Sequence, residues 1–156
     1  NIIKVFNKIA NRHKLPVYFT THPRTKNKLE KLNISSKELI KFIKPIGFTD
    51  YVALQKNAFF TLSDSGTIFE ESAMMKFPAI SVRSATERPE ASESGTIVIG
   101  NINEKSLMQS VDILLKTYDP NLMEIPKEYS IKNVSTRIIR LIQGYTEIIN
   151  REVWHK

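Results

Sequence analysis

The sequence contains no cysteine. Disulfides, thiolate metal sites and cysteine nucleophiles are therefore excluded. No apolar run extends beyond a handful of residues, so the sequence predicts no membrane-spanning helix. The chain of 156 residues, with 25% charged residues, is typical of one soluble globular domain. We expect a cytoplasmic protein, because a chain without cysteine suits a reducing compartment. The chain begins with Asn1 rather than Met, and we expect the natural N-terminus to lie further upstream.

Acidic residues are scarce at the start of the chain. Residues 1–45 hold eleven Lys and Arg residues against Glu30 and Glu38, which makes a net charge of +9 in a chain whose total is +7. A basic segment can attract nucleic acid, anionic lipid or a phosphorylated small molecule. The aromatic residues of this segment stand where core residues would, which disfavours a nucleic-acid module. We therefore expect neither nucleic acid nor a membrane as a partner.

Short β-branched runs alternate with amphipathic segments along the chain. This alternation predicts an α/β fold, with a Rossmann-like parallel sheet and helices on both of its faces. Strands are expected over residues 17–20, 39–43, 59–62, 78–82 and 96–99. Helices are expected before Pro16, over 24–32, from a cap at Thr49 or Asp50 to Asn57, over 68–75, over 103–117 with Asn103 as its cap, and over about 135–151. Ligands of such sheets bind at the carboxyl ends of the strands.

A turn made of Ser65, Gly66 and Thr67 joins an expected strand to an expected helix. Backbone N–H groups at an uncommitted helix N-terminus, together with two hydroxyls, suit a diphosphate. Gly66 would let the backbone approach a phosphate closely. Glu71 stands one turn further on, where a carboxylate can accept the hydroxyls of a ribose. The alternative is an ordinary capped helix without a ligand.

The string Thr86-Glu87-Arg88-Pro89-Glu90 follows the fourth expected strand. Pro89 predicts the first turn of a short helix. Arg88 would then project from a stiffened loop toward a phosphate or toward a carboxylate such as Glu71. A purely structural Arg–Glu pair is the alternative. Both roles can hold at once.

His22 stands at the end of the first expected strand, in Thr21-His22-Pro23-Arg24. A single histidine at such a position is more often structural than catalytic. His13 and His155 are expected on separate helices, so the sequence offers no other ligands for zinc. We expect no metal site.

The order of these strings is similar to that in a known family. The strings are TTHPRT, KPIGFTDY, LSDSGTIFEES, FPAISVR, and TERPE followed by SGT. Together they resemble the C-terminal part of the non-hydrolysing UDP-N-acetylglucosamine 2-epimerases, over about residues 1–149. TERPE some twenty residues after DSG is the most specific of them. DSGT, LQKNAF and YTEIINREVW look more like the branch that makes UDP-N-acetyl-L-fucosamine. The resemblance implies one half of a glycosyltransferase-B-type enzyme with two Rossmann-like domains.

The resemblance also implies roles for individual residues. The chain, 1–156, would be the UDP-binding C-terminal domain, and the seven residues expected to bind UDP are Ile46, Tyr51, Ser65, Gly66, Thr67, Glu71 and Arg88. In this assignment the backbone near Ile46 and the ring of Tyr51 hold the uracil, Glu71 takes the ribose, and the turn holds the diphosphate. His22 matches a histidine near a second, activating UDP-sugar site. Thr67 replaces the family's second glycine, so the backbone there cannot rely on a positive φ.

The implied reaction is an epimerisation at C2 of a UDP-N-acetylhexosamine, such as UDP-GlcNAc to UDP-ManNAc, by elimination and re-addition of UDP. It needs no cofactor. The family's acid and base carboxylates lie in an N-terminal catalytic domain that is absent from this chain, so no catalytic residue is assigned here. The expected partners are a UDP-sugar, the missing domain and, in the full-length enzyme, a second copy. Two alternatives remain open: half of a glycosyltransferase-B-type transferase, and a UDP-sugar-binding module without chemistry.

Overall fold

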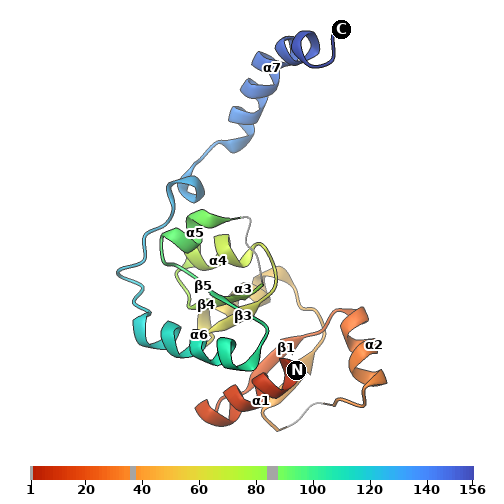
Figure 1. Ribbon diagram of the computed structural model, residues 1–156, viewed down its shortest axis with the longest axis vertical. Coiled ribbons are helices and arrows are strands. Elements are labelled where there is room, and N and C mark those ends of the chain that lie inside the picture. The colour runs from red at the N-terminus through yellow and green to blue at the C-terminus, as the bar shows by residue number, and fades with distance from the viewer. Residues whose placement is uncertain (1, 36–37, 84–87) are drawn as a thin grey trace. The chain divides into compact units, whose positions relative to one another are not determined.

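The computed structural model describes residues 2–35, 38–83 and 88–156. The chain forms two compact units, Asn1–Ile125 and Pro126–Lys156. In the first unit helices alternate with strands (Figure 1). The elements of this unit are α1 (Ile2–His13), β1 (Val17–Thr20), α2 (Pro23–Lys31), β2 (Ile40–Ile43), α3 (Phe48–Asn57), β3 (Thr61–Ser63), α4 (Ile68–Met75), β4 (Ala79–Val82), α5 (Pro89–Glu93), β5 (Val98–Gly100) and α6 (Glu104–Thr117). The second unit holds a 3-10 turn, η1 (Lys127–Ser130), and α7 (Val134–Glu152).

All the strand pairs in the described residues are parallel, as the alternation of elements predicts. β1 pairs with β2, with Val17 opposite Ile40. β4 lies between β3 and β5, and Ser63 of β3 lies opposite Ser81 of β4. These pairings make a two-stranded sheet and a three-stranded sheet. The sequence pattern predicted one continuous sheet instead. The α/β class itself is confirmed.

The three-stranded sheet is covered on both faces. α6 lies on one side of it, and α4 and α5 lie on the other (Figure 1). Ile80 of β4 and Leu107 of α6 are fully buried in the main core cluster. A methyl group on Gly100 would lie 2.9 Å from Ile80 Cγ2, so β5 can approach this core only with glycine there. The burial of these apolar side chains is the main force that holds the layers together.

α1 packs against α6 through an apolar stripe. Val5 and Ile9, spaced one helical turn apart, are buried in the same cluster as Ile80. The ion pairs Lys8–Glu104 and Arg12–Asp112, at 2.8 and 2.6 Å, join the same two helices. Their side chains are substantially exposed, so these pairs contribute little to stability.

The helix ends agree with the sequence predictions in two places and differ in one. Asn103 caps α6, because its Oδ1 accepts a hydrogen bond from the Ser106 N–H at 2.7 Å. Pro89 is the first residue of α5, as its fixed φ predicts. The cap expected at Thr49 or Asp50 is wrong. α3 begins one residue after Gly47, whose carbonyl already accepts from the Tyr51 N–H.

The predicted last helix is confirmed as α7, a continuous helix of 19 residues. Every residue of α7 is exposed within its own unit. Its apolar side chains recur at three- and four-residue spacing, for example at Ile138, Ile142, Tyr145 and Ile149. Among the described residues, no helix is long and apolar enough to cross a membrane.

Candidate functional site

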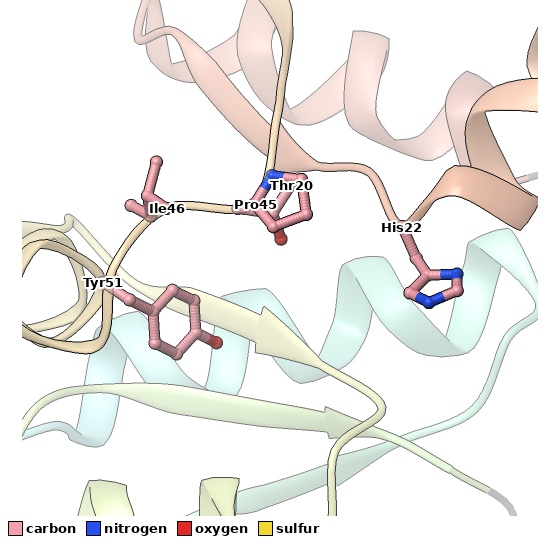
Figure 2. Close-up of a pocket in the computed structure, with 5 residues that line it drawn as sticks. All are labelled: Thr20, His22, Pro45, Ile46 and Tyr51. Atoms are coloured by element: carbon pink, nitrogen blue, oxygen red, sulfur yellow. The ribbon is translucent and has the colours of Figure 1, made fainter.

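A hollow of about 250 Å³ opens at the carboxyl ends of β1 and β2 (Figure 2). Thr20 and His22 line it from the end of β1, Pro45 and Ile46 from the loop after β2, and Tyr51 from α3. Parallel strands bring their carboxyl ends to one edge, which is why two of the predicted ligand loops meet here. The hollow therefore brings together Ile46 and Tyr51, the two residues predicted to hold a base.

His22 lines the same hollow and also caps α2. Its Nδ1 accepts a hydrogen bond from the Arg24 N–H at 3.3 Å, which satisfies one of the free donors at the helix start. Since Nδ1 accepts this bond, the neutral ring carries its proton on Nε2. His22 thus has a structural role as the cap of α2, which is one of the two roles considered for it from the sequence. A second UDP-sugar site at His22 stays a prediction.

The turn before α4 is the second part of the candidate site. The sequence predicts uncommitted N–H groups here, and this prediction is wrong for Ser65 and Thr67. The Ser65 N–H donates to Ser63 Oγ at 3.1 Å, and the Thr67 N–H donates to Ser65 Oγ at 3.3 Å. Short hydroxyl side chains satisfy backbone donors locally in this way. An anion would replace the hydroxyls of Ser63 and Ser65 as partners of these N–H groups. The Ser65 side chain is exposed and can rotate at little cost, whereas Ser63 is half-buried.

The backbone of this turn stays in the right-handed region at Thr67, with φ at −70°. The prediction that position 67 does not rely on a positive φ is therefore confirmed. Gly66 leaves room for two arginine side chains. A methyl group on Gly66 would lie 2.8 Å from Arg88 Nη1 and 3.5 Å from Arg83 Nη1. Glycine thus lets a guanidinium group approach the turn closely.

Arg88 forms an ion pair with Glu70, through Nε and Oε1. The sequence suggested Glu71 as the carboxylate partner of Arg88, and that pairing is wrong. Consecutive helical residues point about 100° apart, so only one of two adjacent glutamates can face α5. The alternative of an Arg–Glu pair holding the loop is confirmed with Glu70. Thr86 and Glu87 of the same string lie outside the described residues.

Glu71 faces α3 instead, where it meets Gln55. The Gln55 side-chain amide donates to Glu71 Oε2 at 2.5 Å. Gln55 is only 3% exposed, so this hydrogen bond is shielded from water. It holds the Glu71 carboxylate in place while leaving its second oxygen as an acceptor.

Tyr51 connects the hollow to the turn. Burial of its hydroxyl raises its pKa above 10.0, the negative charge of Glu71 raises it further, and a hydrogen bond with Ser63 opposes the shift. The phenol therefore keeps its proton at neutral pH and can donate a hydrogen bond. The Tyr51 hydroxyl thus interacts with Ser63 at the end of β3 and lies within electrostatic range of Glu71 on α4.

Comparison with known proteins decides the family. A sequence model described as "UDP-N-acetylglucosamine 2-epimerase" matches residues 1–143. This chain belongs to the UDP-N-acetylglucosamine 2-epimerase family. The UDP-N-acetylglucosamine 2-epimerase of Methanocaldococcus jannaschii is 36% identical over 119 residues, which are 74% of this chain and 32% of that protein. The chain thus spans about a third of the length of the curated relatives it matches.

Solved structures of the epimerase family confirm the fold. The structure of UDP-N-acetylglucosamine 2-epimerase from Rickettsia bellii has a TM-score of 0.84 at 35% identity, and the match covers 99% of this chain and 43% of that one. The M. jannaschii enzyme in complex with UDP-GlcNAc and UDP has a TM-score of 0.80 at 32% identity, over 92% of this chain and 40% of that one. The expected glycosyltransferase-B-type half is consistent with these neighbours.

Two residues of the candidate site carry no signal of their own in the sequence. Gln55 stands in the string LQKNAF, and Arg83 ends FPAISVR, and both strings contributed only to the resemblance. A glutamine inside a helix and an arginine after a strand are usually solvated. Only the hydrogen bond of Gln55 to Glu71 and the position of the Arg83 guanidinium near Gly66 mark them as part of the site. The described residues contain no group of three or more potential metal ligands.

Proposed function

We propose that this chain supplies the UDP site of an enzyme that epimerises a UDP-N-acetylhexosamine at C2. One observation carries the proposal: Tyr51 lines the hollow at Ile46 and also interacts with Ser63 and Glu71, which flank the Ser65–Thr67 turn in the sequence. A base pocket, a carboxylate and an anion-binding turn thus follow one another in the order of uracil, ribose and diphosphate. The solved M. jannaschii enzyme, in complex with UDP-GlcNAc and UDP, supports this assignment.

In this arrangement the backbone near Ile46 and the ring of Tyr51 hold the uracil. Glu71 accepts a ribose hydroxyl with the oxygen that Gln55 does not use. The backbone of Ser65, Gly66 and Thr67 takes the diphosphate at the start of α4, where the helix dipole favours negative charge. Arg88, the residue before α5, adds positive charge while it stays paired with Glu70.

The proposed reaction gives this domain a definite task. A base removes the C2 proton, the C1–O bond breaks, and UDP leaves with the bonding electron pair to give a glycal. UDP then adds back at C1 after C2 is protonated from the other face. The domain must hold UDP through both steps, because the glycal is otherwise lost. We assign the proton transfers to the part of the relatives that this chain does not cover, and we propose a cytoplasmic, homodimeric enzyme that needs no cofactor.

The 156-residue chain is expected to bind UDP by itself. The fold holds the backbone donors in place, but two of them must first leave their serine hydroxyls, and we assign one wall of the site to another domain. We therefore expect a Kd near the boundary between micromolar and millimolar. Titration with UDP and with UMP, followed by amide chemical shifts, should move the signals of residues 65–71. Amides of the exposed helix α7 serve as the internal control. Unchanged signals at 65–71 at saturating UDP would contradict the nucleotide site.

Replacing Glu71 by Gln should weaken UDP binding more than pyrophosphate binding. A hydrogen bond to a charged group contributes about 1.5–3 kcal/mol, and the proposed bond from Glu71 goes to the ribose, which pyrophosphate lacks. Calorimetric titration of both ligands measures the difference. Glu93→Gln removes the same charge from an exposed position on α5 and is the matched control. An equal loss for both ligands would refute the ribose contact.

A further inference from the structure

Arg83 lies beside the proposed diphosphate turn because of the strand register. Ser63 of β3 lies opposite Ser81 of β4 in the parallel ladder. Ser65 and Arg83 each follow two residues later, so the two chains leave the sheet together at the same edge. The Arg83 guanidinium reaches the turn, since its Nη1 would lie 3.5 Å from a methyl group on Gly66.

The charges around the turn give Arg83 a function. Asp64, Glu70 and Glu71 bring three carboxylates to this region, and a diphosphate adds further negative charge. Arg88 is already paired with Glu70. Among the ion pairs of the described residues, none includes Arg83. Of the two arginines near Gly66, Arg83 is therefore the one whose positive charge is not neutralised by a carboxylate of the described residues.

We propose that Arg83 is a diphosphate-binding residue, and that it supplies the charge which selects a nucleoside diphosphate over a nucleoside. The proposal rests on the proposed function. The side chain is half-buried, so its interaction with an anion is screened less than that of a surface cation. A guanidinium group can also donate two parallel hydrogen bonds to phosphate oxygens, which an ammonium group cannot.

The test measures binding of UDP, pyrophosphate and uridine to the 156-residue chain and to Arg83→Gln. Losing a charge-assisted contact should weaken UDP and pyrophosphate by about tenfold to hundredfold, and should leave uridine unchanged. The affinity for UDP should also depend less steeply on salt concentration in the variant. Lys116→Gln removes the same charge from an exposed position on α6 and should change none of these values. Arg83→Lys, which keeps the charge, should retain part of the affinity for pyrophosphate, even if the glutamine variant fails to fold.

The outcomes separate this inference from the function on which it rests. If the unaltered chain binds UDP at residues 65–71 and Arg83→Gln binds it equally well, Arg83 has no part in the site and the nucleotide assignment stands. If Arg83→Gln weakens uridine as much as UDP, the residue has only a structural role and the inference fails. If the unaltered chain does not bind UDP, both the inference and the proposed function fail.

Discussion

No deuterium is expected at C2 of UDP-N-acetylglucosamine after incubation with this chain in deuterium oxide. Exchange at C2 needs a positioned base to remove the proton and a positioned acid to return one from the opposite face. The two glutamates next to the turn have other partners: Glu70 holds Arg88, and Glu71 holds Gln55 and, in our proposal, the ribose. The chain also covers only 43% of the R. bellii epimerase structure. Mass spectrometry or proton NMR of the recovered sugar nucleotide measures the exchange.

The M. jannaschii UDP-N-acetylglucosamine 2-epimerase, assayed under the same conditions, is the positive control and should incorporate deuterium fully. Deuterium introduced by this chain alone would show that the proton-transferring groups lie within residues 1–156, and would refute the proposed division of labour. A protein containing this domain that transfers its sugar to an acceptor, without exchange at C2, would favour the glycosyltransferase alternative. Binding of UDP-sugars without either reaction would favour the binding module.

Replacing Ile80 by Ala should lower the free energy of unfolding by about 2–5 kcal/mol. Ile80 is fully buried on the central strand β4, in the same core cluster as Leu107 of α6 and beside Gly100 of β5. The truncation removes apolar area from the core and leaves a cavity that the paired strands cannot close. Unfolding in denaturant, followed by circular dichroism, measures the change.

Ile99→Ala on the neighbouring strand is the matched control. It removes the same atoms from a side chain that is 41% exposed, so a much smaller loss is expected. Similar losses for the two variants would mean that β4 is not the centre of the core. Because β3 and β4 together carry the turn at Gly66 and the loop with Arg83, the Ile80 variant should also bind UDP more weakly near its unfolding transition.

Much of the fold could be predicted from the sequence because local rules decide it. β-branched runs such as Val17–Thr20 favour strands, and apolar residues at helical spacing favour α1 and α7. Asn103 and Pro89 mark helix starts by their own backbone chemistry. The helix start at Gly47 is the exception, because its cap uses no side-chain hydrogen bond that a sequence pattern could reveal.

The candidate site could be predicted only in part. Ligands of parallel α/β sheets bind at the carboxyl ends of the strands, so the alternation of elements alone directs attention to the loops at Ile46 and at Ser65–Thr67. The satisfied N–H groups in the Ser65–Thr67 turn were not predictable in the same way. They depend on the side-chain torsions of Ser63 and Ser65. A short hydroxyl side chain can bond to several nearby backbone groups at similar energy, so the sequence does not show which bond it makes.

The sequence by itself determined the α/β class, the order of the elements and the strings that place this chain in its family. Tertiary structure alone decided which side chains meet. It paired Arg88 with Glu70 rather than Glu71, placed Gln55 against Glu71, and brought Arg83 to Gly66. The physical reason is that a local pattern reports which face of a helix or strand is buried. The partner on that face depends on helix rotation and strand register, and these are set by contacts between residues far apart in the chain.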